Sequence, residues 1–129
     1  MNADDVNIVK LWESADAKKH SKPHKDRYGH IWWKLSNGKL HREDGPAVEY
    51  ADGGESWYRF DVPHRTDGYA IIDVADDVKS FYILGKRYDD VYEWAEAALQ
   101  YEHPDDWHKF TDEEIEGKVQ QALANDLLR

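Results

Sequence analysis

The sequence predicts an α+β domain, in which an antiparallel β-meander of repeated hairpins with about five strands is followed by two C-terminal helices. Two observations lead to this prediction. A motif in the middle of the chain recurs after 23 residues, between segments that alternate apolar and polar side chains as strands do. The last third of the chain places apolar residues at the spacing of amphipathic helices, next to residues that cap helices well.

The internal repeat is the strongest organising feature of the chain. Residues 41–48, HREDGPAV, recur as residues 64–71, HRTDGYAI, and the aromatic pair at 57–58 recurs at 81–82. Each copy is predicted to form a hairpin, because two alternating segments flank a turn signal. The expected strands cover residues 28–35, 46–50, 55–60, 69–74 and 79–84.

The remaining segments complete a single domain over residues 1–129. Residues 1–27 form an N-terminal segment, in which Val6, Val9 and Trp12 can pack and residues 14–25 form a polar linker. Residues 28–88 hold the hairpin repeats, with a tight turn at Asn37-Gly38. Residues 89–129 form an acidic helical tail.

Two helices are predicted in the tail. Asp89 or Asp90 caps the first helix, which ends at His103-Pro104 because proline cannot continue a helix. Its apolar stripe consists of Val91, Trp94, Ala95, Ala98 and Leu99. Residues 111–114, TDEE, form a capping box for the second helix. Its apolar stripe consists of Ile115, Val119, Ala122 and Leu123.

The repeated motif H-R-x-D-G-x-A invites a catalytic interpretation, because His, Arg and Asp can transfer protons or hold phosphate. The motif occurs twice, however, in a connection that every hairpin needs. Asp can bond its own backbone, Gly tolerates a positive φ, and Arg and Asp two residues apart can form an ion pair. We therefore interpret the motif as structural.

The string NGKLHREDGPAVEYADGGESWY resembles tandem repeats found in uncharacterised proteins of tailed phages and other large viruses. It is also loosely similar to MORN-type repeats, which are β-hairpins punctuated by glycine and aromatic residues. The resemblance covers residues 28–88 and implies a viral or mobile-element origin and a non-enzymatic β-scaffold. The second copy departs from the pattern, with Tyr69 in place of proline and Val78-Lys79 in place of the glycine-rich turn.

The formal net charge of −10 is concentrated in one part of the chain. Residues 88–129 contain twelve acidic and three basic residues, a balance of −9. Such a surface repels nucleic acid, anionic lipid and phosphate-rich ligands, and it attracts basic protein surfaces. The alternative is that the acidic helices only keep the domain in solution.

The composition excludes several further classes of protein. Cysteine is absent, which rules out disulfides, thiol nucleophiles and zinc–thiolate sites. The apolar runs are too short to span a membrane, and the first residues lack the basic start and apolar stretch of a signal peptide. We expect a cytoplasmic protein without cofactor or membrane contact.

We hypothesise a non-enzymatic protein-binding module: a phage-encoded inhibitor or modulator of a host protein, such as a nucleic-acid-handling defence complex. Its acidic surface would occupy a basic groove of the partner, without direct contact to nucleic acid. Exposed Trp, Tyr and Arg dominate interface energetics, although the same rings can instead pack across strands. The candidate partner-binding residues are therefore Glu93, Glu96, Asp105, Asp106, Glu113, Glu114, Tyr28, Trp32, Trp57 and Arg59.

Two other hypotheses stay open. One is a metal-dependent hydrolase that uses the His and Asp residues of 103–108, because such closely spaced side chains can ligate a divalent ion. The other is a structural virion or adaptor protein built from the repeats. The absence of a catalytic motif favours the binding module, and we predict no metal site. The oligomeric state is left open.

Overall fold

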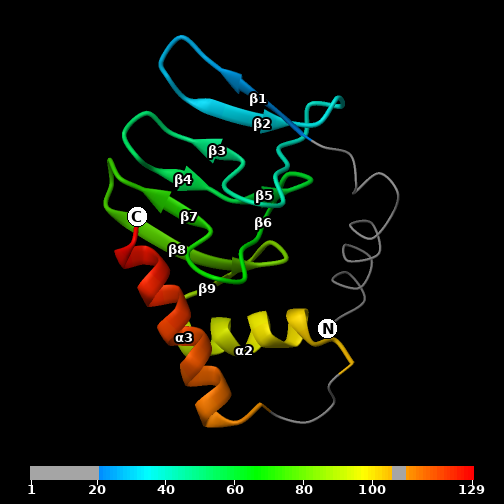
Figure 1. Ribbon diagram of the computed structural model, residues 1–129, viewed down its shortest axis with the longest axis vertical. Helices are drawn as coiled ribbons and strands as arrows, with labels where there is room; N and C mark the ends of the chain where they lie inside the picture. Colours follow the sequence, from blue (N-terminus) through cyan, green and yellow to red (C-terminus); the bar gives the residue numbers. More distant parts are fainter. Residues whose placement is uncertain (1–20, 106–109) are drawn as a thin grey trace.

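The structure is a computed structural model that describes residues 21–105 and 110–129. Seven short strands form one antiparallel sheet in the order β1-β2-β3-β4-β7-β8-β9, and β5 and β6 form a two-stranded ribbon. Helices α2 and α3 lie at the β8–β9 end of the sheet, far from β1 (Figure 1). The predicted α+β class, a sheet followed by two helices, is confirmed. The elements are β1 Lys22–Lys25, β2 Ile31–Lys34, β3 Val48–Glu49, β4 Glu55–Ser56, β5 Tyr58–Arg59, β6 Val62–Pro63, β7 Ile71–Asp73, β8 Val78–Ile83, β9 Lys86–Tyr88, α2 Val91–Glu102 and α3 Asp112–Leu127.

Strand β1 occupies the end of the segment that the sequence predicted as a polar linker. It pairs with β2, so that His24 lies opposite Trp32. The carboxylate of Asp26 builds the connecting turn by accepting the backbone N–H groups of Tyr28 and His30. All four residues of β1 are exposed, which is usual for an edge strand and leaves no apolar alternation to detect. The predicted packing residues Val6, Val9 and Trp12 lie outside the described residues.

The predicted strand 55–60 is divided at Trp57. The N–H of Trp57 donates to the carbonyl of Ala70, and the carbonyl of Trp57 accepts from His64, so the chain leaves the main ladder here. The next residues form the small β5–β6 ribbon. The described part of the chain therefore has shorter and more numerous strands than the five predicted.

A buried histidine ties each repeat to the hairpin that follows it. Nδ1 of His41 accepts the N–H of Phe60 at 3.2 Å, and Nδ1 of His64 accepts the N–H of Leu84 at 2.9 Å. Phe60 and Leu84 have φ angles of 48° and 52°, a left-handed conformation that costs a residue with a side chain roughly 1–2 kcal/mol. Each histidine therefore holds an unfavourable turn in place.

An arginine clamp accompanies each histidine. The guanidinium of Arg42 lies 4.0 Å from the Trp33 ring and bonds the carboxylate of Asp44 and the carbonyl of Pro46. In the second copy the Arg65 guanidinium lies 3.9 Å from the Trp57 ring and makes the equivalent bonds to Asp67 and Tyr69. The predicted Arg–Asp pairing is confirmed in both copies.

The glycine of the motif has a different role from the one predicted. Gly45 and Gly68 do not adopt positive φ angles. A Cβ atom on either residue would lie 2.8 or 2.9 Å from the Cζ atom of the clamp arginine. Both glycines are buried, and the guanidinium crosses directly over their backbone. A residue with a side chain would therefore clash with the arginine.

Both helices begin where the sequence predicts, and α2 also ends where predicted. Asp90 accepts the N–H groups of Tyr92 and Glu93, and α2 ends at His103. Thr111 and Glu114 form the predicted capping box of α3. Leu123 of the predicted apolar stripe is 40% exposed, because Ala122 faces the core and the next residue points about 100° away around the helix.

The main core lies between the last hairpin and the helices. Trp94 is fully buried, and its ring stacks on Phe81 with centroids 4.5 Å apart. Phe81 in turn stacks on Tyr69 at 4.1 Å. The indole N–H of Trp94 donates to the carbonyl of Arg65, which connects α2 directly to the second clamp.

Replacing His64 with alanine is expected to lower the free energy of unfolding by about 2 kcal/mol, because the buried N–H of Leu84 loses its acceptor and a cavity forms. His30→Ala is the matched control, since Nδ1 of His30 also accepts a backbone N–H, that of Ala51, but at an exposed position where water can replace it. Urea denaturation measures both. Equal losses for the two variants would contradict a structural role specific to the buried histidine.

The same histidine predicts a loss of stability in acid. Burial lowers the pKa of His64 from 6.5 to about 3, and burial also lowers the pKa of His41. Between these pH values the unfolded chain binds a proton that the folded chain does not, so stability falls as pH decreases below 6.5. His64 alone accounts for a loss of about 2 kcal/mol by pH 5.

Denaturation between pH 7 and pH 5 tests this linkage. His64→Asn keeps an acceptor near the position of Nδ1 without a titratable ring, so its stability is expected to change less with pH than that of the unmodified protein. His24→Asn, in the exposed strand β1, should keep the original pH dependence. An unchanged slope in His64→Asn would assign the acid sensitivity to other groups.

Candidate functional site

Helices α2 and α3 form an acidic outer layer. The two helices pack on each other and contribute Ala95, Ala98, Val119 and Ala122 to the core. Their solvent side carries three predicted binding residues, Glu93, Glu96 and Glu113, all of them exposed. Asp105, after the end of α2, is also exposed, whereas Asp106 lies outside the described residues.

The described cations of this layer are held in ion pairs within the molecule. Among the described residues from 88 onward, the basic side chains are Lys118 and Arg129. Lys118 is buried, with 7% of its side chain exposed, and pairs with Glu102 across the two helices. Arg129 bonds the carbonyl of Gly53 and pairs with Glu55 of the sheet. In the described helical layer, the outward charges are therefore carboxylates.

Two other glutamates of the layer have structural partners. Glu114 completes the capping box by accepting the N–H and the hydroxyl of Thr111. Glu116 accepts the hydroxyl of Tyr92, and this hydrogen bond raises the pKa of the tyrosine. The predicted binding residue Glu114 is thus committed to the start of α3, whereas the side chains of Glu93, Glu96 and Glu113 remain directed to solvent.

The predicted aromatic and basic residues of the sheet do not lie on one face. The ring of Trp57 is covered by Arg65, and its indole N–H donates to Glu55. Trp32 lies opposite Val48, which lies opposite Ser56, so the side chains of Trp32 and Trp57 belong to opposite faces. The indole N–H of Trp32 donates to Asp26.

The two remaining candidates are also separated. Tyr28 is 65% exposed in the β1–β2 turn, beside the guanidinium of Arg27. Arg59 is half-buried and lines a polar cavity of about 350 Å³ between the two repeat loops. Its positive charge contributes to the lowered pKa of both His41 and His64. Residues of both arginine clamps line this cavity. Trp57 is the one aromatic candidate that lines it together with Arg59.

The alternative metal site is only partly described. His103 and Asp105 follow α2, whereas Asp106 and His108 lie outside the described residues. Within residues 21–105 and 110–129, no group of three or more His, Asp or Glu side chains is placed to hold a metal ion.

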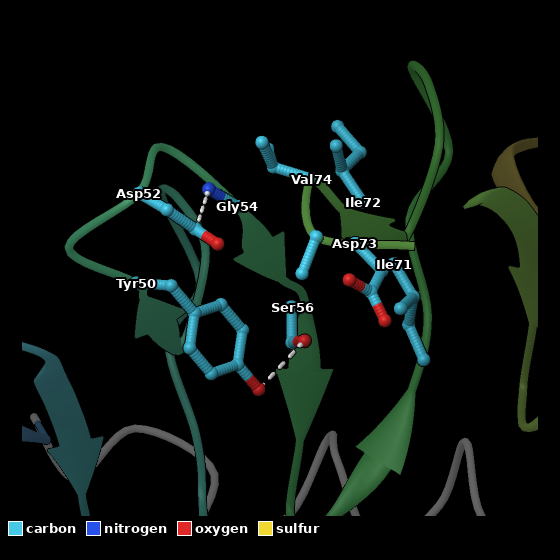
Figure 2. A pocket seen from close by; sticks show the side chains of 9 residues that line it. Tyr50, Asp52, Gly54, Ser56, Ile71, Ile72, Asp73 and Val74 are labelled. Atoms are coloured by element: carbon cyan, nitrogen blue, oxygen red, sulfur yellow. Dashed lines mark hydrogen bonds between the residues drawn. The ribbon is translucent and has the colours of Figure 1, made fainter. Parts of the chain in front are cut away.

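The sequence missed two features of the molecule. One is the buried Lys118–Glu102 pair, which joins α2 to α3. The other is a cavity between the β3–β4 hairpin and the β7–β8 turn, which Tyr50, Asp52 and Asp73 line (Figure 2). The repeat offset could have indicated the cavity, because it places the two hairpin turns side by side.

No protein-family model matches the sequence, and no curated protein or solved structure is similar enough to indicate a relative. Among the described helices, none has the length and apolar character needed to cross a membrane.

Proposed function

We propose that the protein is a non-catalytic binding module whose helical layer docks on a basic surface of another protein. The observation that carries this proposal is the orientation of charge in the described helices. Lys118 and Arg129 are held in internal pairs while Glu93, Glu96 and Glu113 face solvent. An acidic face formed in this way raises the rate of encounter with a cationic partner.

The chemistry of the repeat supports binding rather than catalysis. In each copy the histidine Nδ1 atom accepts a backbone N–H. The arginine guanidinium contacts an aromatic ring and donates to a carboxylate and a carbonyl. Groups with these structural tasks are poorly suited to proton transfer, because a change of protonation would release a hairpin turn. The motif is a scaffold on which the helices are mounted.

The partner class follows from the same charges. A basic groove that normally holds nucleic acid is complementary to a row of carboxylates, so a nucleic-acid-handling protein is the partner we propose. The acidic layer would compete with the nucleic acid for the groove. An inhibitor or modulator encoded by a phage or related element fits this role and the resemblance of the repeats.

Neutralising the helical layer is expected to slow association about tenfold at low salt, because long-range attraction is reduced. The variant is Glu93→Gln, Glu96→Gln and Glu113→Gln together, none of which contacts the core. The control is Glu43→Gln, Asp76→Asn and Asp77→Asn, which changes the net charge equally but at exposed sites on the sheet loops that take no part in the arginine clamps. The partner is first captured from host lysate and identified, and association rates are then measured at several salt concentrations.

Three results separate the hypotheses. Docking through the helices is supported if only the helix variant associates more slowly. It is also supported if added salt lowers the association rate of the unmodified protein more steeply than that of the helix variant. Equal effects of both triple variants indicate non-specific attraction by net charge. Binding that ignores salt and both variants, yet is lost in Trp32→Ala, transfers the site to the sheet and contradicts the proposal.

A further inference from the structure

A cavity of about 310 Å³ opens at the turn end of the central strands, between the β3–β4 hairpin and the end of β7. Figure 2 shows Tyr50 and Asp52 on one side of it and Ile71 and Asp73 on the other, with Val74 above. This volume is at the lower end of the range for ligand pockets, roughly 300–1,000 Å³. The cavity therefore suits a single extended side chain better than a large ligand.

The walls combine apolar and anionic groups. Ile71, Val74 and the Tyr50 ring supply the apolar surface. One oxygen of Asp52 accepts the N–H of Gly54 at 2.9 Å, and one oxygen of Asp73 accepts the N–H of Asp76 at 3.1 Å. These bonds fix both carboxylates, and each carboxylate has a second oxygen through which it can accept further hydrogen bonds.

The cavity is rigidly built. The ring of Tyr50 is held by edge contacts with His30 and Trp32, at centroid distances of 5.5 and 6.4 Å. The hydroxyl of buried Ser56 lies 3.4 Å from that of Tyr50. Gly54 approaches β7 so closely that a Cβ atom would lie 2.8 Å from the carbonyl oxygen of Ile72. A ligand would therefore meet a preformed site.

The same combination of groups holds an arginine twice elsewhere in the molecule. Arg42 lies between the Trp33 ring and the carboxylates of Asp44 and Glu49. Arg65 is likewise placed against the Trp57 ring, with Asp67 and Glu55 as its ion-pair partners. The cavity is likewise lined by a ring and two carboxylates, those of Tyr50, Asp52 and Asp73, and none of its lining residues is basic.

We propose that this cavity binds an arginine side chain of the partner protein. The aliphatic stem would lie along Ile71 and Val74, and the planar guanidinium would contact the Tyr50 ring while donating to Asp52 and Asp73. An anionic ligand is disfavoured by both carboxylates, and a purely apolar one would leave them without a cation. The inference rests on the proposed function in that the basic partner supplies the arginine.

The test uses N-acetyl-arginine amide as the probe and the full-length protein. Titration followed by amide NMR is expected to give saturable shifts at Gly54, Ser56 and Val74 in the millimolar range. N-acetyl-norleucine amide, which has a similar stem without charge, should bind at least about fivefold more weakly. Asp73→Asn keeps the acceptor for the N–H of Asp76 but removes the charge, and it should weaken arginine binding about fivefold.

Asp76→Asn is the matched control, because it makes the same chemical change in the same turn outside the cavity. It should leave the arginine affinity within about twofold. Absence of saturable shifts at these three amides, equal binding of the norleucine amide, or equal weakening in both Asn variants would each overturn the proposal. Since the probe is a free amino-acid derivative, these results do not depend on docking by the helices, and either proposal can fail while the other stands.

Discussion

The buried histidine with its neighbouring arginine clamp is the interaction on which the rest of the sheet depends. Strands β3 and β4 have two residues each, so their ladders supply few hydrogen bonds. The clamp and the histidine compensate by joining each loop to the preceding strand and to the next turn. His41 reaches Phe60 and His64 reaches Leu84, contacts that cross 19 and 20 residues of sequence. Side-chain hydrogen bonds therefore align the repeated hairpins as much as strand pairing does.

The helices complete this arrangement at one end. In the first copy the ring of His41 packs on Phe60 of the next hairpin, with centroids 4.4 Å apart. In the second copy the ring of His64 packs on Tyr101 of α2 at 4.5 Å. Helix α2 thus covers the last repeat, as terminal elements of repeat proteins do. A covering element of this kind has one face fixed by the core and another that is free to carry function, and here the free face is acidic.

The sequence predicted those features that depend on local chemistry. The caps at Asp90 and Thr111 and the Asn37-Gly38 turn, with Gly38 at φ 87°, need only a few adjacent residues. Features that depend on distant partners were missed. Strand β1 is a strand because β2 lies beside it, and Gly45 is a glycine because Arg42 crosses it. The separation of Trp32 from Trp57 likewise follows from the register of β2, β3 and β4, which the periodicity of each single strand does not reveal.

The two proposed contact regions have different physical tasks. Carboxylates exposed on the helices act over about a Debye length, so they influence how fast a basic partner arrives more than how long it stays. The cavity at Tyr50, Asp52 and Asp73 would act at contact distance, and as the proposed arginine site it would distinguish a guanidinium from other groups through ring stacking and bonds to the carboxylates. The time spent on the partner would then depend on the cavity at the hairpin turns, and the rate of arrival on the helices. A module that uses both needs a partner whose basic surface extends past the helices and presents one arginine at the hairpin turns.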